Sequence, residues 1–197
     1  MERVFPDTNV LFPMSVMDMI LTLDRVDAHR FVWSETLLAE WGRVILRSRP
    51  DSSARVEKLT AAIREAFAAN RVPEADFMPL VATLTGPDPD DVLHMAAAVA
   101  GRATFLVTGN LADFPAATLA AHGVKVASAD SYLCRIAADL PDLVVAALND
   151  ISARKTRPPM PVPAIAKALE GAGAPEFADH AVALWEEARG SARTKQG

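Results

Sequence analysis

The sequence predicts an α/β domain built on a parallel sheet and followed by a helical extension. Short apolar runs typical of strands alternate with segments of helical periodicity, and this alternation is the signature of βα units. Beyond about residue 141 the pattern is helical alone, which predicts the extension. We therefore expect an α/β domain over residues 1–140 and a C-terminal helical extension over residues 141–197.

The first elements follow from apolar runs and helix-start residues. Residues 3–6, with the sequence RVFP, predict the first strand. Pro13 suits the first turn of a helix, because apolar residues recur after it at spacings of four and three. Residues 30–33 predict a short strand or an extended lead-in, and Ser34 is placed to cap a helix over residues 35–48.

The middle of the chain alternates between clear and ambiguous elements. The next amphipathic helix opens at Asp51 or Ser52. Residues 76–82 predict an ambiguous strand, which Pro79 would confine to the edge of a sheet. Residues 90–100 predict a helix that is apolar nearly all round, so we expect it to be central.

The remaining strands come late in the predicted α/β domain. Residues 103–107 are the best strand candidate in the chain and residues 124–127 the next, with a short helix ending at Gly123 between them. In the extension, the proline-rich residues 158–163 predict a stiff extended connector.

Length and composition are those of a folded protein. The chain has 197 residues, of which 51% are hydrophobic and 23% charged, so a sizeable core is expected. Wholly apolar stretches such as residues 95–100 are too short to span a membrane, and the first residues lack the apolar run of a signal peptide. We expect a cytoplasmic protein with no membrane partner. The net charge of -5 argues against a protein that wraps nucleic acid over its whole surface.

Polar residues gather where the predicted strands end, and in parallel sheets function gathers at the carboxyl ends of the strands. Asp7 directly follows the first strand, and Asn110 and Asp113 follow the strand over residues 103–107. Asp91 opens the helix before that strand, and Glu40 lies at the edge of the apolar stripe of its own helix. We therefore expect their carboxylates to converge on one crevice.

Each of these residues also has a purely structural explanation. Asp7 suits a turn or a helix cap, and Asp91 suits a helix start, where acids oppose the positive end of the helix dipole. Glu40 is spaced to pair with Arg43 on a helix surface, and Asn110 suits a capped turn. Only the combination of these positions favours a functional site.

A crevice of carboxylates needs a cation, because like charges repel and raise one another's pKa. Mg²⁺ or Mn²⁺ is the natural candidate, since both ions take oxygen ligands. Zinc is disfavoured, because the chain has a single cysteine and its four histidines show no ligand spacing. His94, one helical turn after Asp91, is expected to be a polar residue within a packed helix.

Four segments together resemble one family. They are PDTNVL with Asp7, ETLLAEWGRVI with Glu40, DPDDVLHMAAAVAG with Asp91, and FLVTGNLADFP with Asn110 and Asp113. In this order, over residues 3 to about 135, they resemble the PIN-domain nucleases, the fold of VapC-type toxins in bacterial toxin-antitoxin pairs. The resemblance implies a three-layer α/β/α sandwich with a central parallel sheet, an acidic pocket holding Mg²⁺ or Mn²⁺, and cleavage of single-stranded RNA.

The resemblance also implies roles for single residues. Asp7, Glu40, Asp91 and Asp113 match the acidic quartet, so it implies that they are catalytic and bind metal. Asn110 stands at a catalytic position where many relatives have another aspartate. An amide removes one charge there but still offers a carbonyl oxygen, which predicts a weaker second metal.

Further residues are expected to support this site. Thr8, Asn9 and Thr108 are placed to orient the metal ligands by hydrogen bonds. Arg43 and Arg47 share a flank of their helix with the predicted glutamate, where they would hold RNA phosphates. Solvated charges on a helix surface explain these two arginines equally well.

The resulting hypothesis is a metal-dependent endoribonuclease, the toxin of a VapBC-type pair. Its expected partners are an RNA substrate and an antitoxin protein, with a homodimer as a further prediction. Metal ions activate a water and offset charge on the phosphoryl oxygens, so the products would carry 5′-phosphate and 3′-hydroxyl ends. The helices after about residue 135 exceed a minimal PIN toxin, and packing on the domain, a dimer contact or antitoxin binding would each explain them.

Two other functions stay open. Asp7 begins a segment similar to that of haloacid-dehalogenase-like phosphatases, in which the first aspartate is a covalent nucleophile, but Asn9 cannot act as their general acid. A catalytically weakened PIN module that binds RNA or a protein is the other alternative, for which Asn110 is the one indication.

Overall fold

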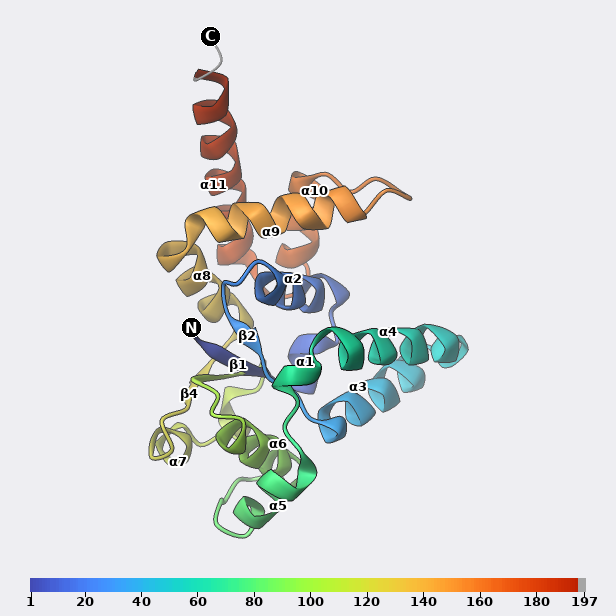
Figure 1. Ribbon diagram of the computed structural model, residues 1–197, viewed down its shortest axis with the longest axis vertical. Helices are drawn as coiled ribbons and strands as arrows, with labels where there is room; N and C mark the ends of the chain where they lie inside the picture. The colour runs from blue at the N-terminus through green and yellow to red at the C-terminus, as the bar shows by residue number, and fades with distance from the viewer. Residues whose placement is uncertain (195–197) are drawn as a thin grey trace. The chain divides into compact units, whose positions relative to one another are not determined.

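The computed structural model describes residues 1–194, and its described part contains a parallel sheet of four strands in the order β2-β1-β3-β4 (Figure 1). In register, Val4 lies between Phe31 on β2 and Phe105 on β3. The strands are β1 (Arg3–Pro6), β2 (Arg30–Phe31), β3 (Phe105–Val107) and β4 (Lys125–Ala127). This sheet, with helices between its strands and after them, confirms the predicted α/β fold class with a C-terminal helical extension.

The strand order determines where a ligand site is expected. From β1 the chain crosses to β2 on one side, whereas β3 lies on the other side of β1. Such a reversal is the topological switch point, and ligands of open parallel sheets bind at the carboxyl ends of the two strands that flank it. Hydrogen bonds continue past these ends, from Asp7 N to Val107 O (2.8 Å) and from Thr108 N to Ala127 O (3.0 Å). Asp7 and Thr108 therefore lie at the same edge of the sheet.

Contacts divide the chain into two compact units, and the first comprises residues 1–12 and 29–128. Local sequence signals start its helices: the Ser34 side chain accepts from Leu37 N (3.2 Å), as predicted, and Asp88 accepts from Asp90 N (2.9 Å). The helices of this unit are α1 (Thr8–Leu11), α3 (Glu35–Ser48), α4 (Ser53–Ala66), α5 (Glu74–Val81), α6 (Pro89–Ala100) and α7 (Ala116–Ala120).

Buried tryptophans connect these elements within the first unit. The indole of Trp41 on α3 donates from Nε1 to Leu11 O (2.9 Å), at the end of α1. Trp33 donates from Nε1 to Phe67 O (2.9 Å), beyond the end of α4. Both side chains are almost fully buried, so the N–H groups need these partners. The position of α1, directly after Asp7, is thereby fixed against α3.

The predicted strand over residues 76–82 is wrong. The segment is the helix α5 (Glu74–Val81), with Glu74 and Asp76 in its first turn and Phe77 buried. Pro79 removes only one N–H from this short helix, and α5 packs along α6 (Figure 1). Tertiary packing on a neighbouring helix therefore overrides the local signal of the proline.

The second unit comprises residues 13–28 and everything from residue 129 onward. Its helices are α2 (Met14–Arg25), α8 (Ala129–Asp139), α9 (Pro141–Arg154), α10 (Val162–Glu170) and α11 (Pro175–Thr194). The predicted connector is correct only in part, because α10 already begins at Val162. The division of the chain at residues 140 and 141 stays a prediction.

Polar contacts hold the second unit together. Arg154 on α9 donates from its guanidinium to Asp18 (3.2 Å) and Thr22 (2.7 Å) on α2. Asp130 on α8 accepts from Glu176 N (3.2 Å) and Phe177 N (2.8 Å), which caps the start of α11. Over residues 1–194, none of the helices combines the length and the hydrophobicity that a membrane span requires.

Candidate metal centre

Asp7 lies at the carboxyl end of β1, where it caps α1 and is almost fully buried. Its Oδ1 accepts a hydrogen bond from Thr8 N (2.6 Å). Its Oδ2 accepts from Asn9 Nδ2 (2.5 Å) and from Thr108 Oγ1 (2.9 Å). These donors fix the orientation of the carboxylate, and they include all three residues that the sequence predicts as supports.

The loop after β3 is linked to the same carboxylate. Asn9 Oδ1 accepts from Gly109 N (2.7 Å), and Thr108 Oγ1 accepts from Asn110 N (3.0 Å). The Asn110 amide in turn donates to Oδ2 of Asp113. Asn9 and Thr108 therefore connect the two strand ends, whereas Asn110 connects this loop to Asp113.

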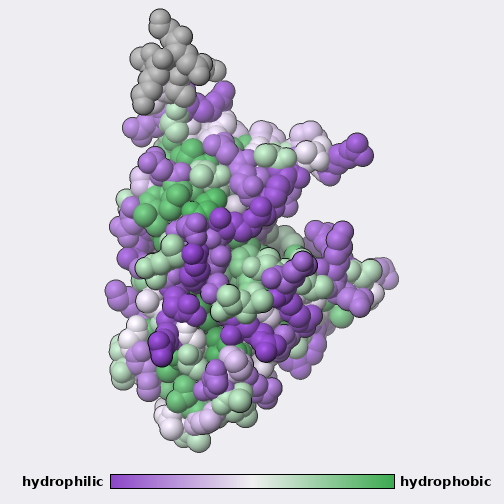
Figure 2. All heavy atoms as spheres, viewed as in Figure 1, coloured by the Kyte–Doolittle hydropathy of each residue, from purple (hydrophilic) through white to green (hydrophobic). Residues whose placement is uncertain are grey.

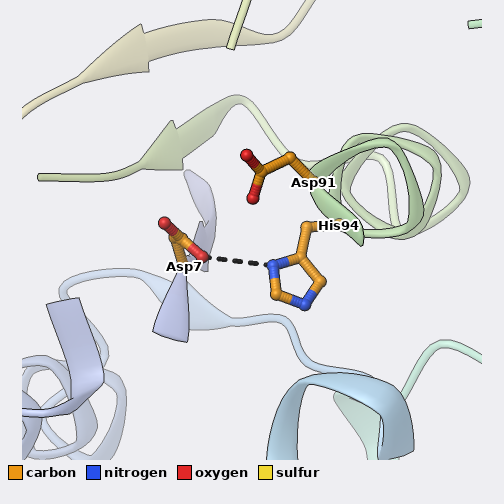
Figure 3. Close-up of side chains that lie close together, drawn as sticks. All are labelled: Asp7, Asp91 and His94. Carbon is orange, nitrogen blue, oxygen red and sulfur yellow. Dashed lines mark hydrogen bonds and ion pairs between the residues drawn. The ribbon is translucent and has the colours of Figure 1, made fainter. Parts of the chain in front are cut away.

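Two side chains of α6 complete the cluster. Asp91 and His94 lie one turn apart, and both reach from the helix toward Asp7 (Figure 3). One ligating atom of each of these three residues lies within 4.8 Å of the others. Asp90, the neighbouring acid, is exposed, so α6 directs Asp91 rather than Asp90 toward the strand ends.

The charges in this cluster shift its pKa values. Burial, followed by the negative charges of Asp7 and Asp88, raises the pKa of Asp91 to about 6. For His94, burial alone would lower the pKa, but the contacts with the carboxylates of Asp7 and Glu40 outweigh this effect and raise the pKa to about 9. His94 is therefore a cation at neutral pH and offsets part of the negative charge around it.

Glu40 faces the cluster from α3. Its Oε2 lies 2.9 Å from Nε2 of His94, an ion pair whose N–H direction falls short of a well-formed hydrogen bond. The contact with His94, opposed by burial, lowers the pKa of Glu40. Oγ1 of Thr8 is buried without a well-formed hydrogen bond, close enough to Glu40 to favour its charged form.

His94 is a buried polar residue of a packed helix, as the sequence predicts, but the structure adds two partners that the sequence does not show. Its side chain is 1% exposed and lies between the carboxylates of Asp7 and Glu40. The crevice of acids also contains a cation of its own, because the charged imidazole of His94 lies beside two of the carboxylates. The signal that could have found His94 is the spacing of Asp91 and His94, since acid and histidine at i and i+3 direct two ligands from one helix in carboxylate metal sites.

The other predicted site residues are more exposed. Asp113, at the end of a short 3₁₀ turn over Leu111–Asp113, is near enough to contribute to the raised pKa of Asp91. Arg43 and Arg47 are exposed on α3, and Figure 2 shows mainly hydrophilic residues at the outer end of the α3 and α4 pair. These two arginines are free to meet solvent or a ligand.

Fold and cluster together define a class: an α/β protein with two aspartates and a histidine gathered at the switch point of a parallel sheet. A family model described as PIN domain matches residues 3–112, more than half of the chain, and the chain therefore belongs to the PIN-domain family. A second model, VapC50 C-terminal domain, matches residues 129–182. With both matches, the chain is a VapC-like PIN nuclease. Searches of curated proteins and of solved structures find no match.

Proposed function

We propose that this protein is the toxin of a VapBC-type pair and cleaves single-stranded RNA by metal-dependent hydrolysis of phosphodiester bonds. Mg²⁺ or Mn²⁺ is the proposed cofactor, and an antitoxin protein is the proposed partner. The two family matches support the class of protein, and the site supports the chemistry.

One observation carries the proposal. Ligating atoms of Asp7, Asp91 and His94, contributed by β1 and α6, lie within 4.8 Å of one another. Two carboxylates and an imidazole form a donor set that fits a divalent ion. An ion there would also relieve the repulsion that contributes to the raised pKa of Asp91.

In the proposed reaction, some residues of this cluster would bind the metal ion and others would orient the attacking water. A bound divalent ion lowers the pKa of a water and offsets charge on the phosphoryl oxygens. Asp7 is buried and held by its hydrogen bonds, so it would serve as the fixed ligand, with Asp91 as the second. Asp113 is partly exposed and would orient the attacking water near the scissile phosphate.

Two arginines extend the proposed site toward the substrate. Arg43 and Arg47 follow Glu40 on α3, one and two turns further along the helix, and both are exposed. Each would hold a phosphate that flanks the cleaved bond, by charge and without reading the base.

The two alternative functions are a phosphatase and a catalytically weakened PIN module. The match to the PIN-domain family argues against the hypothesis of a haloacid-dehalogenase-like phosphatase. In addition, the Asp7 carboxylate accepts several hydrogen bonds, which makes it a poor covalent nucleophile. A weakened PIN module that only binds RNA or a protein is the outcome to be tested against cleavage.

Cleavage of a labelled single-stranded RNA tests the proposal. The proteins are wild type, Asp91→Asn and the matched control Asp90→Asn, each with Mg²⁺, Mn²⁺ or EDTA. We expect wild type and Asp90→Asn to cut with metal, Asp91→Asn to lose about 100-fold or more in rate, and EDTA to stop cutting. The products should accept ligation at a 5′-phosphate.

The outcomes separate the two remaining functions. Equal rates for Asp91→Asn and wild type would exclude the proposed centre. RNA that is bound but left intact with every metal would point to the weakened module.

A further inference from the structure

His94 lies where a nitrogen ligand of a metal ion would lie. Its Nδ1 is 3.1 Å from Oδ1 of Asp7, and the ligating atoms of Asp7, Asp91 and His94 all lie within 4.8 Å. In an octahedral ion with bonds of about 2.1 Å, neighbouring ligands are about 3.0 Å apart and opposite ligands about 4.2 Å apart. The three side chains therefore fit around one ion after only a small approach of their atoms.

The second ring nitrogen of His94 already has a carboxylate beside it. Nε2 lies on the side of the ring away from Asp7 (Figure 3). The distance from this Nε2 to Oε2 of Glu40 is 2.9 Å. Histidines that bind metal through one ring nitrogen usually direct the other N–H to a carboxylate or carbonyl, which fixes the tautomer and the ring orientation. The carboxylate of Glu40 is near enough to Nε2 for this role as an ion-pair partner, and Nδ1 is left facing Asp7 and Asp91.

The position of His94 in the core makes the orientation of its ring rigid. The side chain is 1% exposed, and the ring lies 6.0 Å from the ring of Phe5 on β1, measured between centroids. A side chain enclosed in this way cannot turn to water, so Nδ1 is held toward the two aspartates.

We propose that the site binds its divalent ion through Nδ1 of His94 together with one carboxylate oxygen each from Asp7 and Asp91. Nδ1 carries a proton while the imidazole is charged, and this proton is released to solvent when the ion binds. Glu40 is then a positioning residue that holds the imidazole, instead of a direct ligand. This inference rests on the metal site of the proposed function and assigns its ligands. A nitrogen ligand favours Co²⁺ and Ni²⁺ over Mg²⁺, because imidazole suits transition-metal ions and Mg²⁺ prefers oxygen.

Metal binding to the purified protein tests this assignment without any measurement of cleavage. The proteins are wild type, His94→Asn, Asp7→Asn and the control His180→Asn, which changes an exposed histidine on α11. Asparagine keeps an oxygen ligand at position 94 but removes the nitrogen. Calorimetry gives the affinities for Ni²⁺ and Mg²⁺, and pulsed electron paramagnetic resonance of bound Mn²⁺ detects nitrogen coupling.

We expect Mn²⁺ in wild type and in His180→Asn to show nitrogen coupling, and Mn²⁺ in His94→Asn to show none. The Ni²⁺ affinity should fall about 100-fold in His94→Asn, whereas the Mg²⁺ affinity changes little. Glu40→Gln should keep the coupling and lose about tenfold in Ni²⁺ affinity.

Two results would overturn the assignment in distinguishable ways. Mn²⁺ that binds in an Asp7-dependent manner without nitrogen coupling would leave a metal site of oxygen ligands, so the proposed nuclease would stand and the role of His94 would fall. If the wild-type protein binds neither Ni²⁺, Mg²⁺ nor Mn²⁺, both the proposed metal-dependent nuclease and the role of His94 are excluded.

Discussion

Asp7 Oδ2 accepts a hydrogen bond of 2.9 Å from Thr108 Oγ1, although 101 residues separate the two in the chain. The bond joins the carboxyl ends of β1 and β3, the central strands of the sheet. The same hydroxyl accepts from Asn110 N (3.0 Å), so it both donates and accepts at the switch point. Thr108 therefore links the position of the most buried aspartate to the shape of the loop that carries Asn110.

Thr108→Val should destabilise the protein and misplace Asp7. Valine has the shape of threonine, but it leaves Asn110 N without its acceptor and Asp7 without one donor. We expect the free energy of unfolding to fall by about 1–3 kcal/mol, because buried polar groups lose partners. Urea denaturation measures the loss, and the rate of RNA cleavage should fall with it.

Thr104→Val is the matched control for this change. Thr104 precedes the same strand, is exposed, and its hydroxyl donates to Arg3 O (3.0 Å). Loss of the Thr104 hydroxyl should lower the free energy of unfolding by less than Thr108→Val does, because water can replace the lost hydrogen-bond partner at an exposed position. Equal losses in both variants, with cleavage unchanged, would contradict a positioning role for Thr108.

Local signals in the sequence predict much of this fold. Ser34 caps its helix as expected, because a cap depends only on the next few residues, and Asp88 caps α6 in the same way. Asp7 and Asp91 are found by their positions after a strand and at a helix start. The strand predicted around Pro79 failed, because α5 is determined by its packing on α6, which the segment itself does not encode.

The site shows the same limit. The part played by His94 depends on carboxylates from β1 and α3, Asp7 and Glu40, which approach it only in the folded chain. Similarly, residues 13–28 belong with the helices after residue 128, a relation between distant segments that periodicity along the chain cannot show. The sequence therefore indicates the acids one by one, but it does not show that the His94 side chain contacts both Asp7 and Glu40.

Gly101→Ala should destabilise the first unit. Gly101 ends α6, and a Cβ there would lie 2.5 Å from Val32 Cγ1 and 2.7 Å from Val72 Cγ2. Because both valines are buried, relieving the clash must move packed side chains. We expect the free energy of unfolding to fall by about 1–3 kcal/mol, measured by urea denaturation.

Gly171→Ala provides the comparison for that variant. Gly171 also ends a helix with a helical backbone, but a Cβ there would meet only Lys167 O at 3.5 Å, an ordinary contact. The free energy of unfolding of Gly171→Ala should stay within about 0.5 kcal/mol of that of wild type. Should Gly101→Ala be equally well tolerated, the close packing at the end of α6 would not matter for stability.

Asn110→Asp should make the protein depend more strongly on metal. The Asn110 amide now donates to Asp113, and an aspartate would replace this bond by repulsion between two carboxylates. We expect a lower melting temperature in EDTA and about tenfold tighter Mn²⁺ binding than in wild type, because an added anionic ligand attracts the cation. Differential scanning calorimetry with and without Mn²⁺ measures both effects. Unchanged metal affinity would place Asn110 outside the metal site.

The metal-free protein should lose stability as the pH rises through about 9, because the pKa of His94 is raised to that value by Asp7 and Glu40 despite burial. A raised pKa means that the folded state binds the proton more tightly, so the added stability is complete below the ordinary histidine pKa of about 6.5 and is lost as pH passes the folded value. Asp91 acts with the same sign at lower pH, since its pKa is raised to about 6. Urea denaturation in EDTA at several pH values, for wild type and His94→Asn, separates this effect from the titration of lysines and tyrosine. Wild type should lose stability between neutral pH and about 10, and His94→Asn should lose less. An equal loss in both proteins would show that the charge of His94 does not stabilise the cluster.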